Sequence, residues 1–184
     1  MICCIDSNIF IWGIKRKADP GQENMIDRAL HLFKLMDDNK YRIMLPTVVL
    51  AEILAPEPLE KHPVIMESIG KNFIIADFNM KSASRYGQLF TNKIEELKKI
   101  AKEIDVDNQK MKVDHLIVAS ALVAGANCIY SHDKGLRVFG QKYIDVKDLP
   151  ELPAPQLVQK SIFDGYNLKE GSLVKKERDE NIPF

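Results

Sequence analysis

Apolar and polar positions along this chain follow two different periods. Short apolar runs recur along it, separated by longer segments in which apolar residues return every three or four positions. Runs of the first kind predict buried strands, and segments of the second kind predict amphipathic helices. The strands are expected at residues 2–5, 41–45, 73–76, 128–130 and 143–146. The helices are expected at residues 23–38, 48–54, 62–69, 79–104 and 111–124.

This alternation predicts an α/β protein: a three-layer α/β/α sandwich with a mostly parallel central sheet covered by helices on both faces. Two residues indicate helix ends, since Asn79 is a suitable N-cap and Gly125 a suitable C-terminal stop. After Leu149 the chain becomes rich in proline and then in charge. We therefore expect one domain at residues 1–149 and a C-terminal tail or arm at residues 150–184, partly disordered or docked on a partner.

Length and charge narrow the class of protein. A chain of 184 residues buries a sizeable core without disulfides. Lys plus Arg and Asp plus Glu both number 26, so only a local basic patch could attract nucleic acid. The three cysteines lie in apolar runs and are expected to be reduced and buried. Neither a leader sequence nor an apolar run of about 20 residues is visible, so we expect a cytoplasmic protein.

Four acidic residues interrupt otherwise apolar segments. Asp6 and Asp133 each follow a predicted strand, where parallel sheets bind ligands, although an Asp there also suits a helix cap or a turn. Glu52 lies in VVLAEILA, a helix predicted to be buried on all sides unless this acid reaches solvent and pairs with a lysine. Asp114 shares the apolar stripe of the helix at 111–124, or is an ordinary first-turn acid.

If the four carboxylates meet, their repulsion would raise their pKa values unless a cation lies between them. Hard carboxylate oxygens favour Mg²⁺ or Mn²⁺ over zinc. Such an ion can activate a water molecule and stabilise an in-line displacement at phosphorus. The acids therefore indicate a metal-dependent phosphodiesterase.

Four stretches resemble the acidic motifs of the PIN domain, the fold of VapC-like toxin ribonucleases and of several RNA-processing nucleases. In chain order they are ICCIDSNIF, PTVVLAEIL, VDHLIVASAL and CIYSHDKGL, and together they cover about residues 1–146. The resemblance implies a PIN-like fold with the four acids in one catalytic pocket. Asp6 and Asp114 would be the main metal anchors. Glu52 would hold a second metal or position the attacking water, and Asp133 would complete the pocket.

The resemblance also implies supporting residues and a substrate. Asn8 would orient a neighbouring acid, and Ser131 would bond to a metal-bound water or to an acid, although both also suit turns and caps. The implied reaction is hydrolysis of RNA, in a single strand or a loop, with Mg²⁺ or Mn²⁺. Basic residues near the motifs are candidate phosphate contacts, although each alone suits a solvated surface. They are Lys15, Arg16, Lys112 and Lys134, with Lys17 and Lys110.

An antitoxin protein as partner and a homodimer are further implications. Many PIN relatives carry another acidic residue and a Phe shortly after the fourth acid, whereas this chain has Gly135 and Leu136 there. A catalytically weak or inactive PIN-fold scaffold that binds RNA or protein is therefore the alternative. A haloacid-dehalogenase-like phosphatase is disfavoured, because Asn8 stands where its Asp-x-Asp motif needs a second Asp.

Overall fold

The computed structural model describes residues 1–91, 94–103, 105, 107–153, 166–169 and 172–175. The chain divides into two compact units, Met1–Leu152 and Pro153–Phe184. In the second unit, β6 (Tyr166–Lys169) and β7 (Ser172–Lys175) form an antiparallel pair. Most of the tail expected from residue 150 lies outside the described residues.

Five strands form one parallel sheet in the first unit. They are β1 (Ile2–Ile5), β2 (Arg42–Pro46), β3 (Ile74–Ala76), β4 (Cys128–Tyr130) and β5 (Asp145–Lys147). Their order is β3-β2-β1-β4-β5, and every neighbouring pair is parallel. The central strand β1 fixes the register, because Cys4 pairs with Met44 of β2 and with Ile129 of β4. The predicted strands and the predicted fold class are both confirmed.

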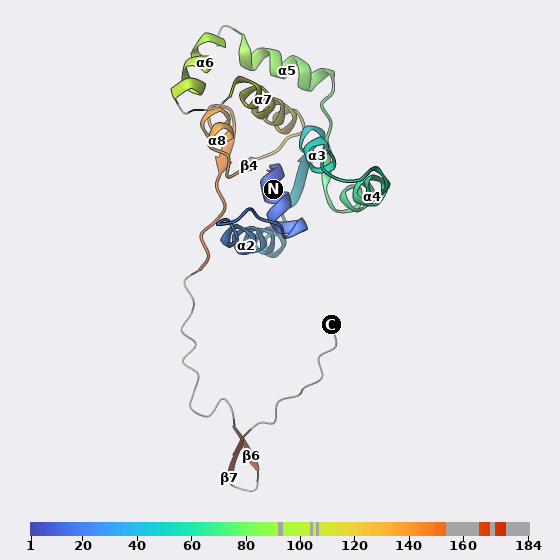
Figure 1. Cartoon of the computed structure of the whole chain (residues 1–184), viewed down its shortest axis with the longest axis vertical. Helices are drawn as coiled ribbons and strands as arrows, with labels where there is room; N and C mark the ends of the chain where they lie inside the picture. Colours follow the sequence, from blue (N-terminus) through green and yellow to red (C-terminus); the bar gives the residue numbers. More distant parts are fainter. Residues whose placement is uncertain (92–93, 104, 106, 154–165, 170–171, 176–184) are drawn as a thin grey trace. The chain divides into compact units, whose positions relative to one another are not determined.

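Helices cover both faces of this sheet, with α2 on one side and α7 and α5 on the other (Figure 1). The longer helices are α2 (Asn24–Asp38), α3 (Thr47–Leu54), α4 (His62–Asn72), α5 (Met80–Phe90), α6 (Ile94–Glu103) and α7 (Asn108–Val123). The shorter ones are α1 (Ser7–Phe10), the π-helix η1 (Ile11–Lys15), the 3₁₀-helix η2 (Leu59–Lys61) and α8 (Lys134–Gly140). In the part of the chain described here, no helix is long and apolar enough to cross a bilayer.

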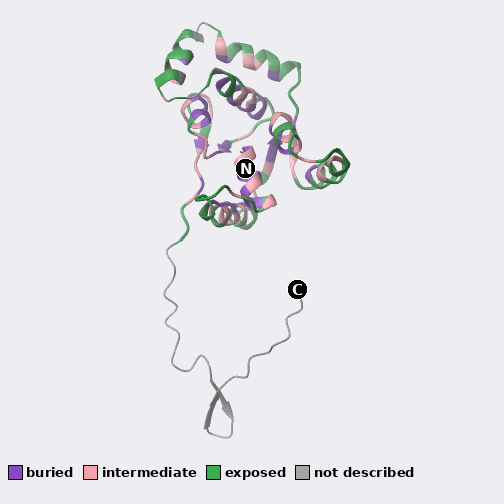
Figure 2. Cartoon of the chain, in the orientation of Figure 1, coloured by how far each residue is buried: buried purple, intermediate pink, exposed green. Residues whose placement is uncertain are grey.

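The core lies between the sheet and these helices, and buried residues gather there (Figure 2). Cys3, Cys4 and Ile5 of β1 are fully buried, as expected for a central strand that is covered on both faces. All three thiols are buried and free, as predicted. On α2 the buried positions recur at helical spacing, which confirms the amphipathic pattern, and they are Met25, Ala29, Leu32 and Met36.

Two predicted helices have different limits in the structure. The single helix expected at 79–104 is wrong: α5 ends where Thr91 leaves the helical conformation (ψ 121°), and α6 follows as a separate helix. Asn79 does cap α5, because its Oδ1 accepts hydrogen bonds from the backbone of Lys81 and Ser82. The helix expected at 111–124 begins earlier, because the Asp107 side chain accepts from the Gln109 amide. Gly125 follows α7 with φ 78°, as predicted for a helix stop.

Candidate active site

The candidate site lies where the order of the sheet reverses. The chain goes from β1 to β2 and β3 on one side, and then crosses to β4 and β5 on the other. The carboxyl ends of β1 and β4 therefore flank a crevice, which is where open parallel sheets bind ligands. Asp6 follows β1 and Ser131 follows β4, and the two ends are joined by the bond from Asp6 N to the Tyr130 carbonyl (3.1 Å).

A cavity of about 420 Å³ opens at this point. It brings together all four predicted acids, Asn8 and one predicted phosphate contact, Lys110. Four lining residues come from one face of α7, with the spacing of successive helical turns. The lining residues are Asp6, Ser7, Asn8, Ile11, Glu52, Lys110, Val113, Asp114, Ile117 and Asp133.

Asp6 is buried, with 6% of its surface exposed, and three hydrogen bonds hold its carboxylate. Oδ1 accepts from the Ser7 amide at 2.6 Å and from the Ser7 hydroxyl at 3.3 Å, and Oδ2 accepts from Ser131 Oγ at 2.8 Å. Burial raises the pKa of Asp6, and the bonds from Ser131 and Ser7 partly offset that rise. Asp6 is thus both the cap of α1 and a lining residue of the cavity, so the two interpretations do not exclude each other.

Asp114 is the second buried acid, with 5% of its surface exposed. Its Oδ2 has no hydrogen-bond partner among the described residues, which is uncommon for a buried carboxylate oxygen. Burial and then the charges of Asp133 and Asp6 raise the pKa of Asp114 to about 8, although the charge of Lys110 acts against this rise. The side chain therefore has a free acceptor in the cavity wall and would be stabilised by a proton or a cation.

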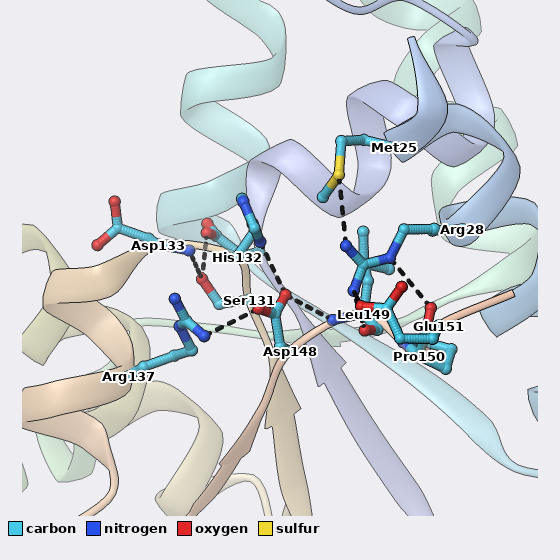
Figure 3. Close-up of polar contacts among 11 residues, drawn as sticks. Met25, Arg28, Ser131, His132, Asp133, Arg137, Asp148, Leu149, Pro150 and Glu151 are labelled. Carbon is cyan, nitrogen blue, oxygen red and sulfur yellow. Dashed lines mark hydrogen bonds and ion pairs between the residues drawn. The ribbon is translucent and has the colours of Figure 1, made fainter. Parts of the chain in front are cut away.

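Asp133 is fixed from two sides. Its Oδ1 accepts from the Leu136 amide at 3.0 Å and caps α8, and its Oδ2 lies 2.5 Å from Lys110 Nζ. Ser131 also accepts from the Asp133 amide at 3.0 Å, so this hydroxyl links two acids of the cavity (Figure 3). Burial alone would raise the pKa of Asp133, but the bonds from Lys110 and Leu136 outweigh it and lower the pKa.

Glu52 lines the cavity, but its predicted burial is wrong. On α3, Val49 and Ile53 are buried, whereas Ala51 and Glu52 are exposed. The all-apolar pattern was misleading because a small Ala is compatible with either face of a helix. Partial burial of the carboxyl and the nearby charge of Asp6 raise the pKa of Glu52, while a hydrogen bond with Ser7 lowers it.

Apart from Lys110, the predicted phosphate contacts are absent from the described lining of this cavity. Lys15 Nζ bonds to Glu57 at 2.6 Å and to the Ile53 carbonyl at 3.0 Å. Arg16, Lys112 and Lys134 are exposed and are absent from the described cavity lining. Gly135 and Leu136 stand where many PIN relatives carry an acidic residue and a Phe. Both lie on the buried face of α8.

A polar cluster that the sequence did not reveal supports the loop after β4 (Figure 3). Asp148 accepts from Arg137 Nη1 at 2.8 Å and lies 2.8 Å from His132 Nδ1. The ring of His132 also meets that of Trp12 edge-on, with centroids 5.8 Å apart. Asp148 directly follows β5. The pattern that selected Asp6 and Asp133, an acid at the end of a predicted strand, could therefore have selected Asp148 as well.

The donor set of the cavity suits a hard cation. Its described lining offers carboxylates and neither thiol nor imidazole, which favours Mg²⁺ or Mn²⁺. The unpartnered Oδ2 of Asp114 is a ready ligand. No three acidic, imidazole or thiol groups among the described residues stand close enough to hold one ion as they are. The Asp133 carboxylate forms an ion pair with Lys110 instead, so these side chains must rearrange before Asp133 can bind a metal.

Comparison with solved structures identifies the fold. Three similar chains belong to VapBC2 from Rickettsia felis, bound to a DNA fragment from its promoter, VapBC-1 from nontypeable Haemophilus influenzae, and DNA-bound VapBC from Salmonella typhimurium. The TM-scores are 0.54, 0.51 and 0.50, and the identities are 18%, 17% and 16%. The matches cover 82%, 81% and 82% of this chain and 100%, 98% and 99% of the others, respectively.

At the level of sequence, no family model matches this chain. No curated protein matches it either. Identities this low establish the fold alone. The chain therefore has the PIN-like fold that its acidic motifs indicated, and it shares this fold with the VapBC proteins.

Proposed function

We propose that this protein hydrolyses phosphodiester bonds in RNA with Mg²⁺ or Mn²⁺, as the toxin of a toxin–antitoxin pair. The observation that carries the proposal is the buried, unpartnered Oδ2 of Asp114 in a cavity lined by three further acids. Burial, and after it the charges of Asp133 and Asp6, raise the pKa of Asp114 to about 8, so a divalent cation beside this carboxylate would stabilise its charged form. The fold shared with VapBC structures supports the same function.

Asp6 and Asp114 would hold the ion, with Asp133 and Glu52 completing its surroundings. Bound there, a divalent ion supplies Lewis-acid stabilisation of the phosphate and lowers the pKa of water. Ser131 and Ser7 keep Asp6 in one orientation, so that its carboxylate does not need to reorganise during the reaction. Asn8 also lines the cavity, where it would orient a neighbouring acid.

Glu52 positions the attacking water and accepts its proton. Its exposed carboxyl faces the cavity from α3, and the pKa of this group is raised by partial burial and by Asp6. A carboxylate with a raised pKa is a better general base near neutral pH than an ordinary Glu. This role requires a side chain that both water and substrate can reach, which fits an exposed Glu52 better than the buried one expected from the sequence.

The RNA phosphates would meet Lys110 at the cavity and the exposed Arg16, Lys112 and Lys134 further out. Such contacts are sensitive to salt and independent of base sequence. An antitoxin would bind as a second protein, and two copies of the chain would form a homodimer. The VapBC composition of the similar structures supports the antitoxin part of this proposal.

A cleavage assay on several single-stranded and structured RNAs, with Mn²⁺ and with EDTA, tests the function. We expect cleavage by the wild type that Asp6→Asn reduces by at least about 100-fold, since even outer partners of metal ligands are worth about 10- to 100-fold. Asp38→Asn, at the exposed end of α2, is the matched control and retains activity. Equal cleavage by the wild type and Asp6→Asn would indicate other chemistry.

The alternative is a catalytically inactive PIN-fold scaffold. Two observations favour this alternative: Asp133 is paired with Lys110, and Gly135 stands where many PIN relatives carry an acid. In the same assay, the scaffold gives no cleavage of any RNA by the wild type. Its RNA binding would then be unchanged by EDTA, because no metal takes part.

A further inference from the structure

Lys110 begins the wall of the cavity that α7 contributes. It lies four residues, or about one helical turn, before Asp114, so both side chains share one face of the helix. Among the described residues that line the cavity, Lys110 alone is basic. Its Nζ lies 2.5 Å from Asp133 Oδ2. The acidic cavity therefore contains a cation that belongs to the chain itself.

The ammonium of Lys110 acts on several acids. A lysine ammonium is charged at neutral pH, and that of Lys110 lies within the cavity and forms an ion pair with Asp133. Burial raises the pKa of Asp114 and of Glu52, and the charge of Lys110 works against both shifts. In the metal-free protein, Lys110 therefore neutralises part of the negative charge that the carboxylates would otherwise hold close together.

Lys110 is the more exposed partner of its ion pair with Asp133. The Lys110 side chain keeps 56% of its surface exposed, whereas that of Asp133 keeps 13%. Lys has a flexible four-carbon stem and a strongly hydrated ammonium, and an ion pair with one exposed partner contributes little free energy. Asp133 stays in place without Lys110, because the Leu136 amide holds its other oxygen. Lys110 can thus leave the pair while the acid keeps its position.

We propose that Lys110 is an internal counter-ion that competes with the divalent metal for Asp133 and leaves this acid when the metal enters. The inference rests on the proposed function, which places Asp133 at the metal site. An oxygen in a short bond with an ammonium is a weaker ligand, and two cations in one cavity repel each other. Metal binding therefore includes the cost of breaking the Lys110–Asp133 pair, so Lys110 raises the metal concentration at which the site is loaded.

Calorimetric titration with Mn²⁺, without RNA and at fixed pH and ionic strength, tests this role. The test variant is Lys110→Met, which keeps the stem and removes the charge. The control is Lys34→Met on α2, where the side chain is exposed and outside the described cavity lining. We expect Lys110→Met to bind Mn²⁺ about three- to tenfold more tightly than the wild type, and Lys34→Met to stay within about twofold.

Each outcome has a separate meaning. If Lys110→Met and Lys34→Met bind Mn²⁺ equally well, or if Lys110→Met binds more weakly than the wild type, the inference is wrong while the metal site stands. If none of the three proteins binds millimolar Mn²⁺, the metal site is wrong and the inference falls with it. Thermal unfolding without metal checks that each variant is folded, and Lys110→Gln, with a polar tip, replaces Lys110→Met if that variant unfolds.

Discussion

Asp114 has a buried carboxyl group with an unpartnered oxygen, and its pKa is strongly raised. Its pKa is about 8 in the folded protein, against 3.8 for an ordinary Asp, first because it is buried and then because Asp133 and Asp6 are near. Between about pH 4 and about pH 8, the folded state holds a proton that the unfolded chain has released. Protonated Asp114 therefore stabilises the metal-free protein at low pH, and this contribution is lost as pH rises through this window.

We predict that Asp114→Asn gains stability relative to the wild type as pH rises from about 5 to about 8 in EDTA. The gain should exceed about 1 kcal/mol, since one pKa unit corresponds to about 1.4 kcal/mol. Urea unfolding at a series of pH values measures it. Asp38→Asn, at the exposed end of α2, is the control for the loss of one carboxylate. A constant offset for Asp114→Asn would contradict the raised pKa.

At this scale the sequence predicted which acids meet but not how each is held. Asp6 and Asp133 could be selected because both follow apolar strands, and Asp114 because it shares an apolar stripe. Glu52 lines the predicted cavity, but it was selected because its helix looked apolar on all sides. That pattern was misleading, since the neighbouring Ala51 is exposed and an alanine does not show which face of a helix meets solvent. The contact of Lys110 with Asp133 depends on how α7 and α8 pack, and local patterns do not encode that. Metal binding by these acids stays a prediction.

The π-helix η1 packs against α2 at a position where only glycine fits. A Cβ on Gly13 would overlap the ring of Phe33 of α2. This close approach lets α2 lie directly over the segment that leads away from Asp6 and α1. Added volume in such a contact forces side chains or backbone to move, at a cost of about 1–3 kcal/mol.

We therefore predict that Gly13→Ala destabilises the protein by about 1–3 kcal/mol, and that Phe33→Leu in the same chain recovers part of the loss. Gly87→Ala is the matched control, because a Cβ at this helical position of α5 meets no atom within 4 Å. That change should stabilise the protein by up to about 1 kcal/mol through helix propensity. Chemical denaturation of the four proteins measures all effects. Equal destabilisation by both alanines would show that contact with Phe33 is not the cause.

Among the helices, length decided what the sequence could predict. The strands were predicted from short apolar runs and the long helices from their period, whereas α1 and α8 have only four and seven residues, too few for a helical period to appear. Their caps, Asp6 and Asp133, were noticed for their carboxylates and are what start these helices. The break after Phe90 was missed because the apolar stripe continues beyond it, although Thr91 already turns away from helical geometry.

For the first unit as a whole, the residues that follow β5 contact both the loop after β4 and helix α2. Asp148 binds His132 and Arg137, and Leu149 is 3% exposed. Arg28 of α2 then donates to the carbonyls of residues 149 and 150 and pairs with Glu151 (Figure 3). Residues 148–151 thus connect the loop after β4 to α2. We therefore expect the domain to need residues through Leu152, beyond the boundary at 149 that composition suggested.

Two truncations separate these boundaries. A chain that ends at Leu152 should unfold within about 2 °C of the full chain, because it keeps the whole first unit. A chain that ends at Lys147 loses a buried Leu and the carboxylate that binds Arg137 and His132, so we predict a loss of about 3 kcal/mol or more. Thermal and urea unfolding measure both, and Arg28→Ala in the full chain isolates the contribution of α2. If the chain ending at Lys147 were as stable as the chain ending at Leu152, residues 148–151 would not belong to the folding unit, and the loop that carries Ser131 and Asp133 would be held by β4 and α8 alone.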